Sequence, residues 1–108
     1  MAKSYDQLLK QVRSQIREVS PVQVRGQLAD GGRPVLLDVR EPDEYQQGAI
    51  EGARHIPRGY LEQRIEQEVP DRQQPIVIYC AGGVRSAFAA ATLKSKRMVR
   101  ICSSRTAL

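Results

Sequence analysis

The sequence is poor in the residues that mark several common classes of protein. Its 108 residues contain no tryptophan, one phenylalanine, one histidine and two cysteines. Two cysteines do not make a disulfide framework, so we expect a cytoplasmic protein whose thiols stay reduced. No apolar run approaches the length that spans a bilayer, and residues 1–4 do not open a signal segment. The composition therefore predicts one soluble domain with a single core and no membrane partner.

The positive charge is confined to the end of the sequence. The formal net charge is +5, but residues 1–93 carry 12 basic and 12 acidic side chains. The whole excess comes from a segment without any acid, in Lys94, Lys96, Arg97, Arg100 and Arg105. A neutral body with a basic end is weak evidence for nucleic-acid binding, so we predict no nucleic-acid partner.

Helical and strand-like segments alternate along the chain. Apolar residues at helical spacing predict an amphipathic helix within residues 1–19, ahead of the domain. Further helices are expected at 20–29, 41–47, 61–69 and 87–93, and strands at 35–39, 53–57 and 75–79. Strands that alternate with helices predict an α/β fold with a parallel sheet covered on both faces.

The most informative segment contains Cys80. A β-branched run predicts a buried strand over 75–79, and the alanine-rich residues 87–93 predict a helix. Between them lie Cys80 and a loop with two glycines that closes with Arg85. Such a loop directs backbone N–H groups, a helix N-terminus and a guanidinium at one sulfur atom. We therefore predict a nucleophilic Cys80 with a pKa below the usual value of about 8.5, at roughly 4–7. A buried structural cysteine is the alternative.

Four blocks of the sequence together resemble the rhodanese family of sulfurtransferases. They follow one another in the family's order and spacing, at Val35–Arg40, Glu41–Tyr45, Gly48–Pro57 and Tyr79–Ser86. The resemblance implies a three-layer fold in which a five-stranded parallel sheet lies between helices. It divides the chain into a helix at 1–19, a rhodanese-like domain at 20–96 and an atypical basic tail at 97–108.

The resemblance also implies the chemistry, without cofactor or metal. Cys80 would take the outer sulfur of thiosulfate or of a protein persulfide, such as one on a cysteine desulfurase. It would hold that sulfur as a persulfide and pass it to a thiophilic acceptor. The loop that would cradle the sulfur consists of Ala81, Gly82, Gly83, Val84, Arg85 and Ser86. Asp38 and Arg40 match the family's Asp-x-Arg pattern and would organise the site.

Two details bear on the donor and on a rival activity. Dual-specificity phosphatases resemble this family in fold but have a cysteine loop one residue longer. Cys80 to Arg85 spans six residues, the sulfurtransferase length. Many family members carry a basic residue after the cysteine, where this chain has Ala81. We therefore expect weak use of thiosulfate and a preference for a protein persulfide donor.

The end of the sequence departs from the family. The family usually continues after residue 96 with a last strand, a glycine-rich turn and a closing helix. Residues 97–108 contain no glycine or tryptophan, which resembles a truncation or a change of reading frame. We expect the closing helix to be missing and residues 98–102 to be able to form a last strand that buries Met98, Val99 and Ile101. The alternative function is a catalytically silent module that binds a partner, or a defective product.

The remaining candidates have structural interpretations. His55 has no cysteine or acid at metal-ligand spacing, so we predict a structural role. Cys102 could resolve a persulfide on Cys80, but we expect an incidental thiol. Tyr5 and Tyr45 are predicted to pack on helix faces.

Overall fold

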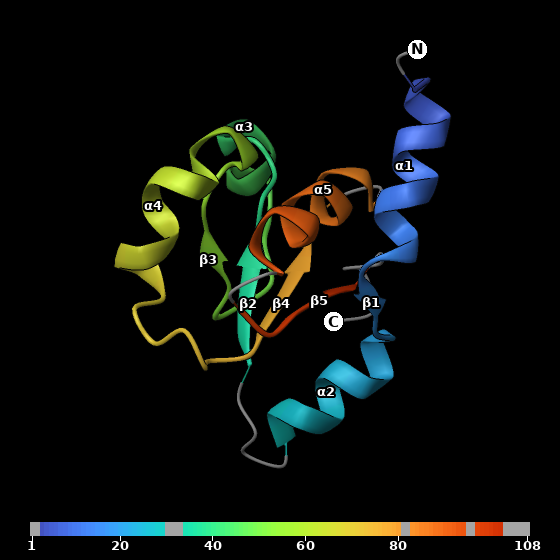
Figure 1. Cartoon of the computed structure of the whole chain (residues 1–108). Coiled ribbons are helices and arrows are strands. Elements are labelled where there is room, and N and C mark those ends of the chain that lie inside the picture. Colours follow the sequence, from blue (N-terminus) through green and yellow to red (C-terminus); the bar gives the residue numbers. More distant parts are fainter. Residues whose placement is uncertain (1–2, 30–33, 81–82, 95–96, 103–108) are drawn as a thin grey trace.

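The computed structural model of the chain describes residues 3–29, 34–80, 83–94 and 97–102. Helices and strands alternate along it, as predicted (Figure 1). The helices are α1 (Tyr5–Ser14), α2 (Pro21–Ala29), α3 (Pro42–Gln46), the 3-10 helix η1 (Arg58–Tyr60), α4 (Leu61–Glu68) and α5 (Val84–Leu93). The strands are β1 (Arg17–Glu18), β2 (Val35–Asp38), β3 (Arg54–His55), β4 (Ile76–Tyr79) and β5 (Val99–Cys102).

The five strands form one parallel sheet in the order β1-β5-β4-β2-β3. This confirms the predicted fold class. In the register of the three central strands, Asp38 at the end of β2 lies beside Tyr79 of β4, and Tyr79 lies beside Cys102 of β5. The carboxyl ends of these three strands therefore lie side by side along one edge of the sheet. Parallel sheets bind their ligands at this edge.

The core divides into two layers because successive side chains of a strand point to opposite faces. In β4, Ile76 and Ile78 join the larger apolar cluster, to which α1, α4 and α5 also contribute. Val77 and Tyr79 point the other way and pack with Val24 of α2. Helices therefore cover both faces of the sheet, with more of them on the side of α5.

The first helix is shorter than predicted. The spacing of apolar residues suggested a helix within 1–19, but α1 ends at Ser14 and residues 17–18 form the edge strand β1. The N–H of Val19 donates to the carbonyl of Ile101 at 2.8 Å. Residues 17–18 therefore pair with β5 as a strand and do not continue the expected helix, because tertiary contacts override a weak local preference for helix.

Two side chains predicted to be packed are exposed. Tyr5 lies in the first turn of α1 with 59% of its surface exposed, beyond the part of α1 that packs on the core through Val12. Met98 is 57% exposed because it precedes β5, at the edge where the chain enters the sheet. The strand expected at 98–102 forms one residue shorter, as β5, in which Ile101 is buried as predicted and Val99 is only half-buried. The rest of the basic tail, 103–108, lies outside the described residues, and the expectation of a missing closing helix falls there.

None of the helices in the described ranges is long and apolar enough to cross a membrane.

Two leucines provide a matched test of the core. Leu37 of β2 is fully buried, whereas Leu8 of α1 is 43% exposed. We expect Leu37→Ala to lower the free energy of unfolding by about 2–5 kcal/mol, through lost burial and the cavity left behind. Leu8→Ala should cost less than about 1 kcal/mol. Urea unfolding of both variants checks this, and equal losses would contradict the core described here.

Candidate active site

Cys80 directly follows β4 at the carboxyl edge of the sheet, and its residue surface is 1% exposed. Its Sγ accepts the backbone N–H of Gly83 at 3.1 Å and that of Ser86 at 3.3 Å. The Ser86 hydroxyl lies 3.5 Å from the same sulfur and donates to the carbonyl of Gly83 at 3.1 Å. Two N–H groups aimed at one sulfur favour its negatively charged form.

The backbone of Gly83 makes this geometry accessible. Gly83 precedes the first residue of α5 with φ of +82°, a left-handed conformation that glycine adopts without strain. The N–H groups of a first helical turn have no partner within the helix, so they can bond to the sulfur. The positive end of the helix dipole adds to their effect. Of the predicted cradle, Val84 and Arg85 follow in α5, whereas Ala81 and Gly82 lie outside the described residues.

Arg85 is held by an acid that the sequence did not single out for the site. Its guanidinium donates to the two carboxylate oxygens of Glu44 of α3, at 2.5 and 2.9 Å. These bonds lower the pKa of Glu44 to about 2. The same pairing raises the pKa of Arg85, to which the nearby Cys80 also contributes. Arg85 thus ties the cysteine loop to α3, and Glu44 balances its charge.

Asp38, the last residue of β2, forms a buried ion pair with Arg40. The guanidinium Nε of Arg40 lies 3.0 Å from each carboxylate oxygen of Asp38, and its Nη2 lies 2.7 Å from Oδ2. Nη2 also donates to the carbonyl of Gly48 at 2.7 Å, and Nη1 to that of Glu44 at 3.4 Å. The bonds to Asp38 raise the pKa of Arg40. The pair therefore fixes the path of the chain between β2 and β3.

His55 and its neighbours complete this support. The Nε2 of His55 lies 2.8 Å from the carbonyl oxygen of Arg40, and its ring stacks on Tyr45 with centroids 4.2 Å apart. Tyr79 is buried, which raises its pKa to about 12, and its hydroxyl accepts the N–H of Ile50 at 3.4 Å. His55 thus makes structural contacts and Tyr45 packs on its ring, in line with the role predicted for each.

Cys102 belongs to the other side of the sheet. Cys80 is part of the cluster under α5, whereas Cys102 is part of the cluster under α2. Both are buried, and neither forms a disulfide. With its side chain on the opposite face, Cys102 is not placed to resolve a persulfide on Cys80.

Within the described ranges, no three or more histidine, cysteine, aspartate or glutamate side chains gather as metal ligands would.

The fold and the site together define an α/β protein with a cysteine thiol held in a helix-N-terminal cradle at the carboxyl edge of a parallel sheet. A family model, the rhodanese-like domain, matches residues 20–104. The chain belongs to the rhodanese-like domain family.

Individual relatives agree with this assignment. A sulfurtransferase of Allochromatium vinosum is 32% identical over 90 residues, covering 83% of this chain and 82% of the relative. A thiosulfate sulfurtransferase of Escherichia coli is 40% identical over 50 residues, covering 46% and 48%. A solved structure from Rhodopseudomonas palustris, of unknown function and termed a possible tyrosine phosphatase, matches with a TM-score of 0.80 at 27% identity, covering 96% and 86%. The chain spans 27–51% of the length of three curated relatives, the Escherichia coli protein among them.

The ion pair of Asp38 and Arg40 should be essential to stability. We expect Asp38→Asn to lower the free energy of unfolding by about 3–5 kcal/mol, because it leaves the buried guanidinium of Arg40 without its counter-charge. A matched control is Glu66→Gln, which breaks an exposed pair with Arg72 and should cost at most about 1 kcal/mol. Chemical unfolding measures both. Similar losses of unfolding free energy in the two variants would show that the buried pair contributes no more to stability than the exposed pair does.

The ion pair of Glu44 and Arg85 should make stability depend on pH. The folded-state pKa of Glu44, about 2, lies below its ordinary value of 4.5. Its carboxylate therefore stabilises the fold fully above pH 4.5, and this contribution is lost as the pH falls toward 2. We expect Glu44→Gln to cost about 1–2 kcal/mol at neutral pH, because solvent screens a pair whose side chains are about one-third exposed.

Urea unfolding at pH 7, 4.5 and 3 measures this. The difference in free energy of unfolding between wild type and Glu44→Gln should become smaller as the pH falls. Glu62→Gln, at an exposed pair with Arg58, serves as the control and should show a small difference at every pH. A loss of stability in Glu44→Gln that stays constant down to pH 3 would contradict a lowered pKa of Glu44 in its pair with Arg85.

Proposed function

We propose that the chain is a sulfurtransferase that carries sulfane sulfur on Cys80. The observation that supports this most directly is the Sγ of Cys80, which accepts the N–H groups of Gly83 and Ser86. The same donors that favour a thiolate favour the terminal sulfur of a persulfide, which is also an anion. The membership in a family with sulfurtransferase relatives agrees with this chemistry.

The reaction proceeds in two displacements at sulfur. The thiolate of Cys80 attacks the outer sulfur of the donor and forms a new S–S bond. The donor's own bond to that sulfur breaks, and its electron pair leaves with sulfite or with a thiolate. An acceptor thiolate then attacks the outer sulfur of the persulfide, and Cys80 departs as a thiolate. No net oxidant or reductant is needed, because the sulfane sulfur is passed on at the same oxidation level.

The charge around the loop favours a persulfide donor over thiosulfate. Thiosulfate carries two negative charges, and the residue after Cys80, which is basic in many family members, is Ala81 in this sequence. Arg85 is the remaining cation of the loop, and Glu44 neutralises it at 2.5–2.9 Å. A donor that leaves as a single thiolate needs less positive charge than one that leaves as sulfite. We therefore propose a protein persulfide, such as that of a cysteine desulfurase, as the preferred donor, with thiosulfate as a poor one.

The remaining roles follow from this assignment. Asp38 and Arg40 position the loop through α3 and do not react. Two cysteines that form no disulfide suit a reducing compartment, and we propose the cytoplasm as the place of action.

Sulfur loading of Cys80 tests the proposal. We expect the intact mass of the protein to rise by one sulfur atom after treatment with a persulfide donor, and to rise less completely with equimolar thiosulfate. The gain should be absent in Cys80→Ser and unchanged in Cys102→Ser, a matched buried cysteine on the other face of the sheet. Cyanide, an acceptor of sulfane sulfur, should return the mass to its starting value.

Three results would count against the proposal. Equal loading of Cys80→Ser would place the sulfur elsewhere. A folded wild type that takes no sulfur from either donor would favour the silent partner-binding module. Hydrolysis of an aryl phosphate that disappears in Cys80→Ser would make the chain a phosphatase.

A further inference from the structure

Arg85 brings a positive charge to the sulfur of Cys80, and Glu44 cancels that charge. Arg85 lies in the first turn of α5 and interacts with Cys80, which contributes to the raised pKa of the arginine. Both terminal nitrogens of its guanidinium also donate to the carboxylate of Glu44, at 2.5 and 2.9 Å. An anion that approaches Cys80 therefore meets an ion pair and not a free cation.

The position of Glu44 is set by its own helix and by the end of β2, and not only by Arg85. Its Oε1 accepts the backbone N–H of Glu41 at 3.1 Å, as part of the capping box of α3. Its backbone carbonyl accepts from the guanidinium of Arg40 at 3.4 Å. A glutamine at this position keeps an oxygen for the capping bond and the same backbone carbonyl, so its main effect is to remove the negative charge.

The charged groups that support the site cancel one another. Asp38 and Arg40 form a buried pair whose side chains are 0% and 2% exposed. Glu44 and Arg85 form the second pair. These two carboxylates and two guanidinium groups together carry no net charge, although the whole chain carries +5. The loss of the carboxylate of Glu44 would therefore change the charge beside Cys80 from zero to +1.

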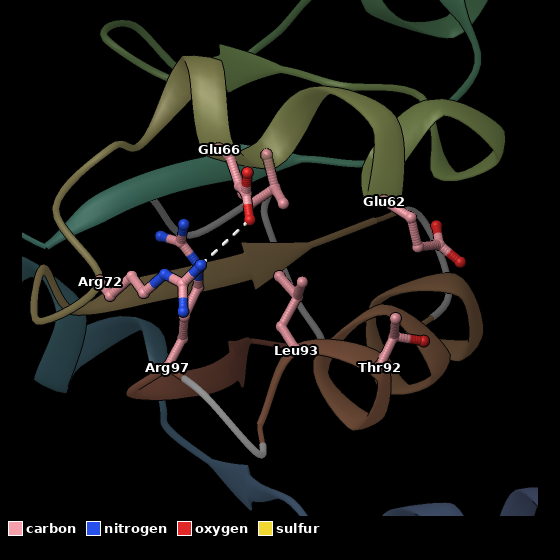
Figure 2. A pocket seen from close by; sticks show the side chains of 7 residues that line it. Glu62, Glu66, Arg72, Thr92, Leu93 and Arg97 are labelled. Carbon is pink, nitrogen blue, oxygen red and sulfur yellow. Dashed lines mark hydrogen bonds and ion pairs between the residues drawn. The ribbon is translucent and has the colours of Figure 1, made fainter.

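The pair of Glu44 and Arg85 is better shielded from water than a similar pair elsewhere in the fold. Its side chains are 32% and 31% exposed. In the hollow between α4 and α5, Glu66 and Arg72 pair at 3.2 Å, and their side chains are 72% and 57% exposed (Figure 2). Water and salt screen exposed charges more strongly than partly buried ones. An anion at Cys80 should therefore respond to a change of charge at Glu44.

We propose that Glu44 is a specificity-determining residue that sets which anionic charge the site of Cys80 accepts. It acts through Arg85 and does not touch the reacting atoms. With its carboxylate in place, a reagent that brings two negative charges to the sulfur gains little from Arg85, and one that brings a single charge or none loses little. For sulfur donors this rests on the proposed function, whereas the selection by charge at Cys80 is measurable without sulfur transfer.

Two alkylating reagents of similar size measure the charge at Cys80. Iodoacetate carries one negative charge and iodoacetamide carries none, and with both the thiolate forms a C–S bond while iodide leaves with its electron pair. The ratio of their rate constants therefore does not depend on the fraction of thiolate. In a Cys102→Ser background Cys80 is the only thiol. We expect Glu44→Gln to raise the ratio of iodoacetate to iodoacetamide about threefold at low salt, and less at high salt.

Further variants separate this effect from unfolding and from general surface charge. Arg85→Gln should lower the ratio, and Glu44→Gln/Arg85→Gln, which is neutral again, should return it to the wild-type value. Unfolding would move all three variants in the same direction. Asp43→Asn removes the same charge from an exposed neighbour in α3, and Glu66→Gln removes it from the exposed pair with Arg72, so both should leave the ratio unchanged. No rise in Glu44→Gln, or an equal rise in Asp43→Asn, would overturn the proposal.

Two small sulfur donors connect the charge to sulfur transfer. Thiosulfate carries two negative charges and leaves as sulfite, whereas an aryl thiosulfonate carries one and leaves as a sulfinate. In both cases the thiolate of Cys80 takes the outer sulfur, and the electron pair of the broken S–S bond goes to the leaving group. Because Coulomb energy is proportional to charge, Glu44→Gln should raise kcat/KM about tenfold with thiosulfate and about threefold with the thiosulfonate.

The outcomes keep the two proposals apart. Equal kcat/KM gains with the two donors, or no gain with thiosulfate, would contradict selection of donors by Glu44 and leave sulfur transfer standing. A wild type that takes sulfur from no donor would overturn the proposed function. The alkylation ratios would then still decide whether Glu44 sets the charge at Cys80.

Discussion

The buried ion pair of Asp38 and Arg40 is the interaction on which the geometry of the site depends. Asp38 ends β2, and Arg40 reaches from it to the carbonyls of Glu44 and Gly48, so the pair sets the position of α3. From α3, the carboxylate of Glu44 holds Arg85, in the first turn of α5. The cradle that presents N–H groups to Cys80 is thus fixed from two sides, by the sheet and by α3.

Two opposing effects meet at the sulfur of Cys80. Burial disfavours a thiolate, since it removes water from the charge, whereas the N–H groups of Gly83 and Ser86 and the end of α5 favour it. Glu44 balances the charge of Arg85, which also interacts with Cys80, so backbone dipoles and a neutralised guanidinium act on the sulfur together. Backbone dipoles act at short range, so in the proposed reaction they would hold a sulfur on Cys80 without attracting highly charged anions from a distance.

The parts of this structure that sequence predicts are the ones encoded by neighbouring residues. The strand before Cys80, the helix after it and the Asp38-x-Arg40 pattern are each contained in a few consecutive positions. Glu44 was visible only as an acid in a helical first turn, because its partner Arg85 lies 41 positions away. β1 has two residues, both exposed, and therefore no apolar pattern that would mark a strand. Its pairing with β5 comes from the tertiary fold.

The same distinction explains where positive charge gathers in the fold. Composition shows an excess of cations after residue 93, but Arg17 is not part of that excess and lies beside Arg100 only through the register of β1 with β5. Both arginines leave the sheet on the same face, and Glu18 lines the same hollow as they do. The fold thus brings together charges that the sequence spreads over two distant segments.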